Sequence, residues 1–186
     1  MLESTVASGK ILLAEPFMLD PNFKRSAVLL CDHSKDEGSV GFILNKPLQT
    51  KINELIDEFP DFDSEVFFGG PVQMDTVHYL HNVGDLLEES IEVFRGVYWG
   101  GDFEKLKFLV AQDLIKPHQI RFFVGYSGWS EGQLDDEMNY GSWVLANMDA
   151  NYLFKSEPET LWQLIMENKG NTYSVIAQMP DDLSWN

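Results

Sequence analysis

The fold is decided by residues 120–137, IRFFVGYSGWSEGQLDDE, in which an apolar run is followed by glycines, a tryptophan and a group of carboxylates. The apolar run at 120–125 predicts a β-strand that is covered on both faces. Ser130 and Gln133 have the S-x-x-Q spacing of a capping box, which predicts that a short helix follows. We therefore expect a strand that ends near Gly125 and turns through Ser127 into this helix.

Ser127 is the first candidate for chemistry in this stretch. The nucleophile elbow of α/β-hydrolases reads G-x-S-x-G, and here Gly125 matches the first glycine while Trp129 replaces the second. That fold also places its catalytic histidine after the serine, whereas all four histidines of this chain precede Ser127. We therefore interpret Ser127 as part of a turn and not as a nucleophile.

The charge balance restricts the classes of partner. The chain has 186 residues with 44% hydrophobic content, which is typical of a globular protein, and we expect one domain over residues 1–186. Its 13 Lys and Arg against 30 Asp and Glu give a net charge of −17. Affinity for DNA or RNA depends on basic contacts with phosphates. The composition therefore argues against direct nucleic-acid binding, and against binding to acidic membranes for the same reason.

The compartment is predicted from three features of the sequence. The amino terminus has no basic segment typical of a signal peptide, and no apolar run approaches the roughly 20 residues that a membrane span needs. Cys31 is the single cysteine, so the chain forms no internal disulfide. We expect a cytoplasmic protein with no membrane association.

Short β-type segments alternate with helix-type segments along the chain, and no low-complexity linker separates them. This pattern predicts an α+β or mixed α/β fold. The predicted strands cover residues 10–14, 26–33, 40–45, 66–68, 77–81, 97–99, 120–125 and 143–146. Several of them are continuous apolar runs, which predicts burial on both faces.

Three further helices are predicted, two of them from their end signals. Asp102 caps a helix that runs to about Leu114, with an apolar face directed inward. Ser156 and Glu159 have capping-box spacing, and the helix that they predict ends before Gly170. A third helix is expected at 52–59.

Two pairs of side chains carry alternative chemistry. Cys31 and His33 share a face of a predicted strand and would form a thiolate pair, although a cysteine inside an apolar run is more often a small buried side chain. His78 and His81 are three residues apart, which places them on opposite faces of a strand. No accompanying zinc motif is present, so we predict no metal site and no cofactor.

The glycine pairs are interpreted as tight turns. Gly69-Gly70-Pro71 follows a strand but lacks the Lys-Ser/Thr of a P-loop. Gly100-Gly101 opens a helix, but Asp102 places negative charge where a phosphate would bind. Asn45, at the end of another strand, is expected to hold loop backbone.

Together these stretches resemble the YqgE/AlgH family of bacterial proteins. The resemblance rests on GKILLAEPFMLDPNFKRSAVLLCDH, GFILNKPL, FFGGPV, HYLH and GYSGWSEGQLDDE, which extend over nearly the whole chain. The family pattern falls on Asn45, Pro47, Gly69, Gly70, Pro71, Val72, Leu80, His81, Gly125, Gly128, Trp129, Gly132, Gln133, Leu134 and Glu137. Ser127 stands where the family commonly has alanine, and the closing VIAQMPDDLSWN differs from the glycine-containing end of many members.

The resemblance implies a single α+β domain with a bent mixed β-sheet, partly barrel-like and surrounded by helices. It implies no established enzymatic activity. One branch of the family has been linked to transcriptional control of alginate production, which for this acidic chain would be an indirect role.

Our first hypothesis is a non-catalytic domain that binds a protein partner or a small ligand. Its surface would combine the segment from Trp129 through Gln133 to Glu137, the Gly69-Gly70-Pro71 turn and the loop from Asn45 to Pro47. His81 and Gly128 complete the candidate binding residues, and all of these could equally hold the fold together.

Two other hypotheses remain open from the sequence. The first is an unrecognised enzyme that uses Cys31 with His33, or His81 with a nearby carboxylate. The second is indirect regulation of gene expression through a basic partner that meets the acidic surface.

Overall fold

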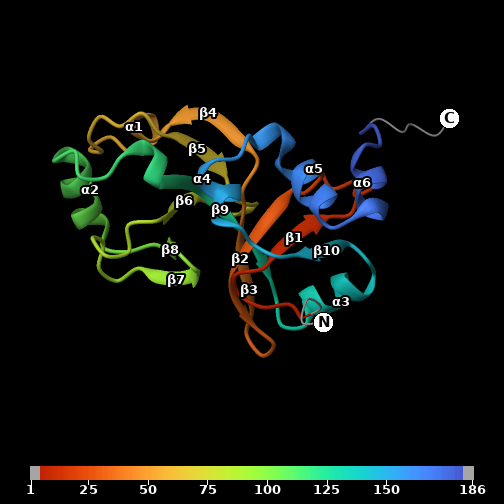
Figure 1. The fold of residues 1–186 in the computed structure, drawn as a ribbon. Helices are drawn as coiled ribbons and strands as arrows, with labels where there is room; N and C mark the ends of the chain where they lie inside the picture. The colour runs from red at the N-terminus through yellow and green to blue at the C-terminus, as the bar shows by residue number, and fades with distance from the viewer. Residues whose placement is uncertain (1–4, 182–186) are drawn as a thin grey trace.

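The computed structural model describes residues 5–181 of the chain (Figure 1). The strands are β1 Ile11–Ala14, β2 Ala27–Ser34, β3 Gly38–Ile43, β4 Pro47–Lys51, β5 Glu65–Phe68, β6 Val72–His81, β7 Ile91–Phe94, β8 Val97–Trp99, β9 Ile120–Trp129 and β10 Trp143–Ala146. The helices are α1 Ile52–Leu55, α2 Phe103–Ala111, α3 Gln133–Asn139, α4 Ala150–Phe154, α5 Pro158–Asn168 and α6 Asn171–Ala177, with a 3-10 turn at Pro117–Gln119. Within these residues, none of the helices is both long and apolar enough to cross a bilayer.

The strands form one ten-stranded sheet with the order β10-β1-β2-β3-β9-β6-β8-β7, to which β5 and β4 are attached through β9. All pairings are antiparallel except that of β5 with β9, which is parallel. The expected α+β class and mixed sheet are confirmed. The sheet is not closed into a barrel, because β10 and β7 lie at the two ends of the strand path.

Helices cover the sheet at separate places and create three clusters of buried side chains. Along β1, Ile11 and Leu13 belong to the cluster that contains Trp162 of α5, whereas Leu12 and Ala14 belong to the cluster beneath α3. This alternation shows why the apolar run at 10–14 is continuous, since both faces of β1 are buried. Helices α5 and α6 lie together at one end of the molecule and α2 at the other (Figure 1).

All eight predicted strands overlap observed ones, and two observed strands escaped prediction. These are β4 and β7, each of which pairs with a single neighbouring strand. Edge strands of this kind carry exposed polar side chains, as the burial of β4 illustrates, and therefore lack a strong apolar signal.

The strand at the centre of the opening stretch is longer than predicted. It does not end near Gly125 but continues to Trp129. Gly125 has φ +67, a conformation that glycine adopts without a steric penalty, so the residue bends the strand instead of ending it. The predicted turn at Ser127 is therefore wrong.

Both predicted capping boxes are incomplete. Gln133 Oε1 accepts the backbone N–H of Ser130 at 3.0 Å, but the N-cap of α3 is Gly132 and receives no side-chain hydrogen bond. In α5 the N-cap is Glu157, also without a side-chain bond, because Pro158 takes the first helical position.

The other helices are shorter than predicted. Asp102 does cap α2, accepting the N–H of Lys105, but the helix ends at Ala111 and Leu114 is exposed. The helix expected at 52–59 is the single turn α1.

Candidate functional site

The predicted glycine turn and the centre of β9 cross at very close range. An added Cβ at Gly70 would lie 2.2 Å from the carbonyl carbon of Tyr126, and one at Gly125 would lie 2.3 Å from the oxygen of Gly70. Ser127 is fully buried here and donates from Oγ to the oxygen of Gly69 at 3.0 Å. Glycine is needed at both positions because the backbone of the Gly69-Gly70 turn lies directly against that of β9. The hydrogen bond from Ser127 holds these two segments together.

The corner between β9 and α3, around Trp129, is stabilised by internal contacts. The Trp129 ring is 6% exposed and packs edge-on against Trp143, whose Nε1 donates to Oε1 of Glu137 at 3.2 Å. The second oxygen of Glu137 is buried without a hydrogen-bond partner among the described residues. On its outer side, Trp129 joins Gly128 in lining a hollow of about 380 Å³ whose carboxylates include Asp32.

His81 lies at the far end of β9 from this corner, because it pairs with Ile120 whereas Trp129 is the last residue of the strand. Its Nε2 contacts the oxygen of Gly100 at 2.7 Å and its Nδ1 accepts the N–H of Val83. Burial lowers the pKa of His81, and the bond to Gly100 offsets part of this effect. A neutral ring with both nitrogens engaged in internal bonds is not available to a substrate.

Cys31 and His33 do not form a reactive pair in this arrangement. Cys31 is buried at a β-bulge between Leu30 and Asp32, and burial raises the pKa of its thiol, with a smaller contribution from Asp32. The thiolate is therefore disfavoured. The ring of His33 bonds instead to Oγ of Ser39 at 2.6 Å.

Asn45, one of the predicted site residues, is hydrogen-bonded to the backbone next to a group of cations that was not predicted from the sequence. Its Nδ2 donates to the oxygen of Arg25 at 2.9 Å, and its Oδ1 accepts the N–H of Ala27 at 3.1 Å. Asn45 thus holds loop backbone, as predicted. The backbone that it holds includes Arg25 at φ +51, a left-handed conformation that is unusual for a residue with a side chain.

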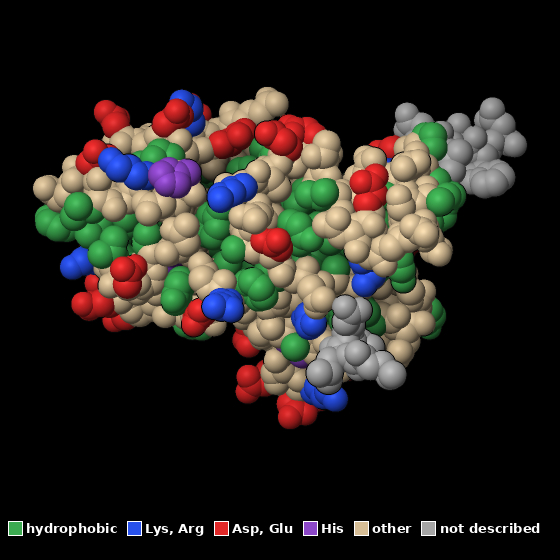
Figure 2. All heavy atoms as spheres, viewed as in Figure 1, with side chains coloured by type: hydrophobic (Ala, Val, Ile, Leu, Met, Phe, Trp, Pro, Cys, Tyr) green, Lys and Arg blue, Asp and Glu red, His purple; other side chains and the backbone are tan. Residues whose placement is uncertain are grey.

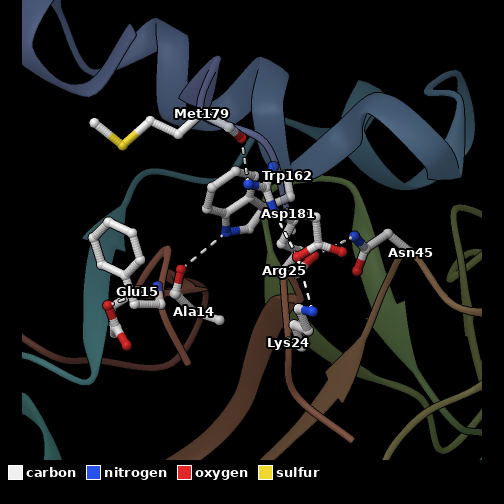
Figure 3. A network of polar contacts seen from close by, with 9 residues as sticks. Ala14, Glu15, Lys24, Arg25, Asn45, Trp162, Met179 and Asp181 are labelled. Atoms are coloured by element: carbon white, nitrogen blue, oxygen red, sulfur yellow. Dashed lines mark hydrogen bonds and ion pairs between the residues drawn. The ribbon is translucent and has the colours of Figure 1, made fainter. Parts of the chain in front are cut away.

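The side chain of Arg25 joins the loop before β2 to the C-terminal part of the chain (Figure 3). Its guanidinium carbon lies 4.6 Å from the ring centroid of Trp162, a buried residue whose Nε1 donates to the oxygen of Ala14. Nη2 donates to the main-chain oxygen of Met179 at 2.6 Å, and Nε lies 3.3 Å from Oδ1 of Asp181. One arginine therefore contacts both a main-chain carbonyl and a carboxylate.

Two lysines complete the group, which we call the Arg25 cluster: Lys24, Arg25 and Lys46. Lys24 Nζ lies 3.1 Å from Oδ1 of Asp181. Burial lowers the pKa of Lys46, while the charges of Asp20 and Asp181 raise it and offset part of that effect. Two of the 13 cations of the chain thus form ion pairs with one carboxylate, while Lys46 Nζ donates to the oxygen of Pro21 at 3.1 Å.

This concentration of positive charge stands out on an acidic molecule. Figure 2 shows Asp and Glu side chains around much of the visible face, with Lys and Arg mostly at single positions between them. The one sequence signal for the cluster is the pair Lys24-Arg25 next to an apolar strand. Its partner Asp181 is 156 residues away from Arg25, too far for any spacing rule.

A family model described as AlgH-like matches residues 11–174. The chain belongs to the AlgH-like family. The resemblance to YqgE/AlgH proteins is thereby confirmed, and the match spans β1 to α6, including every residue of the Arg25 cluster but not Asp181.

Relatives in the AlgH-like family match along almost their whole length. The UPF0301 protein of Chlorobaculum parvum is 45% identical over 174 residues, which cover 94% of this chain and 92% of the relative. That of Cytophaga hutchinsonii is 39% identical over 178 residues, covering 95% and 97%.

Two solved structures share the fold. The solution structure of AlgH from Pseudomonas aeruginosa has a TM-score of 0.75 at 26% identity, with 95% of this chain and 96% of that chain covered. A crystal structure of a Corynebacterium diphtheriae protein has a TM-score of 0.78 at 19% identity, with 96% and 95% covered, and that likeness concerns the fold alone.

Proposed function

We propose that this AlgH-like protein is a non-catalytic cytoplasmic domain that binds a carboxylate-bearing peptide segment of a partner protein at the Arg25 cluster. In the free chain, the segment around Asp181 occupies this site. A partner segment of the same chemistry would displace it. Indirect control of gene expression, as the family resemblance implies, would then act through the partner.

The observation that carries this proposal is the pair of contacts made by Arg25. The guanidinium meets the main-chain oxygen of Met179 and, two residues further, the carboxylate of Asp181. A carbonyl and a carboxylate at this spacing are features that any short acidic peptide presents. Arginine is suited to such recognition because its planar fork carries five N–H donors.

The internal segment satisfies the cluster only in part. Nε of Arg25 is buried, yet its approach to Asp181 makes an ion pair without a hydrogen bond. Buried donors that lack a partner reduce stability, so a peptide that accepts a hydrogen bond from Nε of Arg25 would gain affinity over the internal segment.

The net charge restricts the partner further. A chain of −17 repels another strongly acidic protein over distances of about 10 Å at ordinary ionic strength. A partner that is neutral or basic overall and presents one exposed acidic segment avoids this repulsion. The Arg25 cluster would bind the acidic segment, and the acidic surface of this chain would attract the basic remainder of the partner.

Affinity capture from native cell lysate tests the proposal. The full chain, Arg25→Gln and Asp181→Asn would each be immobilised, and the retained proteins identified by mass spectrometry. A specific partner should be retained more strongly by Asp181→Asn than by the unmodified chain, because the competing carboxylate is removed. It should be lost from Arg25→Gln.

Lys155→Gln serves as a matched control, since Lys155 is exposed and distant in sequence from the cluster. A peptide of residues 175–186 should elute the partner. Equal retention of the same proteins by the unmodified chain, Arg25→Gln and Asp181→Asn would contradict the proposal.

A further inference from the structure

A second polar hollow, which shares no lining residue with the Arg25 cluster, lies between β5, the start of β9 and the helix α4. It has a volume of about 270 Å³. Its walls include Glu65 and Phe67 from β5, His118 from the 3-10 turn before β9, Arg121 from β9 and Phe154 from α4. A space of this size accepts a small metabolite and not a drug-sized molecule.

Arg121 is held in this hollow by two contacts. Its guanidinium carbon lies 4.2 Å from the ring centroid of Phe67, and Nη1 donates to the oxygen of Leu44 at 3.1 Å. Burial lowers the pKa of Arg121 to about 10, while the charge of Glu65 raises it. The ring and the carbonyl fix the plane of the guanidinium, so its remaining donors are held ready for a ligand.

Within the described part of the chain, this guanidinium forms no ion pair, although Glu65 is near enough for its charge to raise the pKa of Arg121. Among the described residues, no carboxylate oxygen lies within ion-pair distance of Arg121. Charged groups that leave water are normally paired, because desolvation of an unpaired charge is costly. A ligand carboxylate would supply the missing charge, and two parallel N–H···O bonds are its preferred geometry with arginine.

The neighbouring carboxylates determine what else the ligand carries. Glu65 accepts the N–H of Gln49 at 3.0 Å, and Asp63 forms an ion pair with Lys51 at 2.7 Å. Both line the hollow together with Arg121, and of the two carboxylates only that of Asp63 has a cation partner within ion-pair distance among the described residues. A phosphate or a dicarboxylate would be repelled, whereas an ammonium group beside Glu65 would be attracted.

We propose that this hollow binds a free amino acid or a similarly small zwitterion. The ligand carboxylate pairs with Arg121, its ammonium group lies toward Glu65, and its side chain packs against Phe67 and Phe154. No residue of this site belongs to the Arg25 cluster, so the two proposals succeed or fail independently.

Titration of the ¹⁵N-labelled full chain with each of the twenty proteinogenic L-amino acids, followed by NMR, tests the inference. At least one amino acid should shift the amide signals of residues 64–67 and 118–121 saturably, with a dissociation constant below about 1 mM. For that ligand, the analogue without the amino group and the analogue without the carboxylate should each bind at least about tenfold more weakly.

Variants assign the binding to the named groups. Arg121→Lys keeps the charge but loses the planar fork and should weaken binding at least about tenfold. Glu65→Gln should weaken binding of the amino acid without affecting that of its analogue lacking the amino group. Arg95→Lys, at an exposed position, should leave affinity unchanged.

The NMR spectrum of each variant reports whether it is folded, and Glu65→Gln changes an exposed side chain, so at least one variant remains informative. The inference is overturned if none of the twenty amino acids causes saturable shifts. It is also overturned if the ligand binds Arg121→Lys, or if its analogue without the amino group binds the unmodified chain, with undiminished affinity.

Discussion

Asn45 holds Arg25 through the main chain: its Nδ2 donates to the Arg25 oxygen at 2.9 Å while Arg25 adopts φ +51. A residue recognised by the family pattern thus positions a cation that the same pattern did not identify. The hydrogen bond to the main chain fixes the position of the Arg25 backbone. At the other end of the side chain, the guanidinium carbon lies 4.6 Å from the ring centroid of Trp162.

Asn45→Ala should lower the free energy of unfolding by about 1–3 kcal/mol, because the Arg25 oxygen and the Ala27 N–H lose their partner. Asn45→Asp keeps the acceptor for Ala27 but places a carboxylate oxygen against the Arg25 oxygen, so it should also be destabilised. Urea unfolding measures both, with Asn139→Ala as the control, since Asn139 is exposed and a change there should stay within about 0.5 kcal/mol. Equal stability of Asn45→Ala and the control would contradict this role.

Arg25→Gln should loosen the C-terminal helix α6. The variant loses the bond to the Met179 oxygen, the ion pair with Asp181 and the contact with Trp162. Amide hydrogen exchange of residues 171–181 should become faster, while that of β1 to β3 stays unchanged. Asp181→Asn removes only the ion pairs and should have a smaller effect. Unchanged exchange in Arg25→Gln would show that α6 is held by other contacts.

The crossing of β9 with the glycine turn predicts two different magnitudes of destabilisation. Ser127→Ala removes one buried hydrogen bond and should cost about 1 kcal/mol. Gly70→Ala places a Cβ 2.2 Å from backbone at φ +154 and should cost more than about 3 kcal/mol. Chemical denaturation of both variants provides the comparison, and similar losses would argue against a close backbone crossing.

The buried His81 and the half-buried His78 predict a loss of stability on mild acidification. Burial lowers the folded-state pKa of His81 and of His78 below the ordinary value of 6.5. Below pH 6.5 the unfolded chain therefore binds protons that the folded chain does not. As the pH is lowered from 6.5, the free energy of unfolding decreases until the folded-state pKa is reached.

Urea unfolding between pH 7.5 and 5.5 measures this slope. His81→Gln should show a smaller decrease than the unmodified chain, whereas Asn139→Ala, at an exposed position, should retain the full decrease. If His81→Gln and the unmodified chain have the same slope, His81 does not contribute to the pH dependence.

Residue patterns predicted the strands with apolar runs because burial on both faces leaves a continuous signal, as in β1 and β2. They failed where a glycine can either end a strand in a turn or bend a strand that continues. Gly125 is of a residue type typical of turns, but its positive φ lets β9 bend past Gly70 and continue to Trp129. Only the position of the neighbouring Gly70 segment shows that the strand bends at Gly125 and does not end there.

The candidate site was less accessible to sequence reasoning than the fold. Asn45 was assigned its contact with loop backbone from its place after a strand, and this is confirmed. The Arg25 cluster depends on Asp181 and on Trp162, which tertiary packing alone brings to the loop before β2. Whether the corner of Trp129 and Gln133 contacts a partner stays a prediction.

Binding of a fluorescently labelled peptide of residues 175–186, measured by anisotropy, tests the central claim most directly. The attached C-terminal segment competes at an effective concentration in the millimolar range, so the peptide should bind Asp181→Asn about three- to tenfold more tightly than the unmodified chain. Arg25→Gln should show no saturable binding, and Lys155→Gln should match the unmodified chain. Equal affinity of the unmodified chain, Asp181→Asn and Arg25→Gln for the peptide would contradict a carboxylate-binding site at the Arg25 cluster.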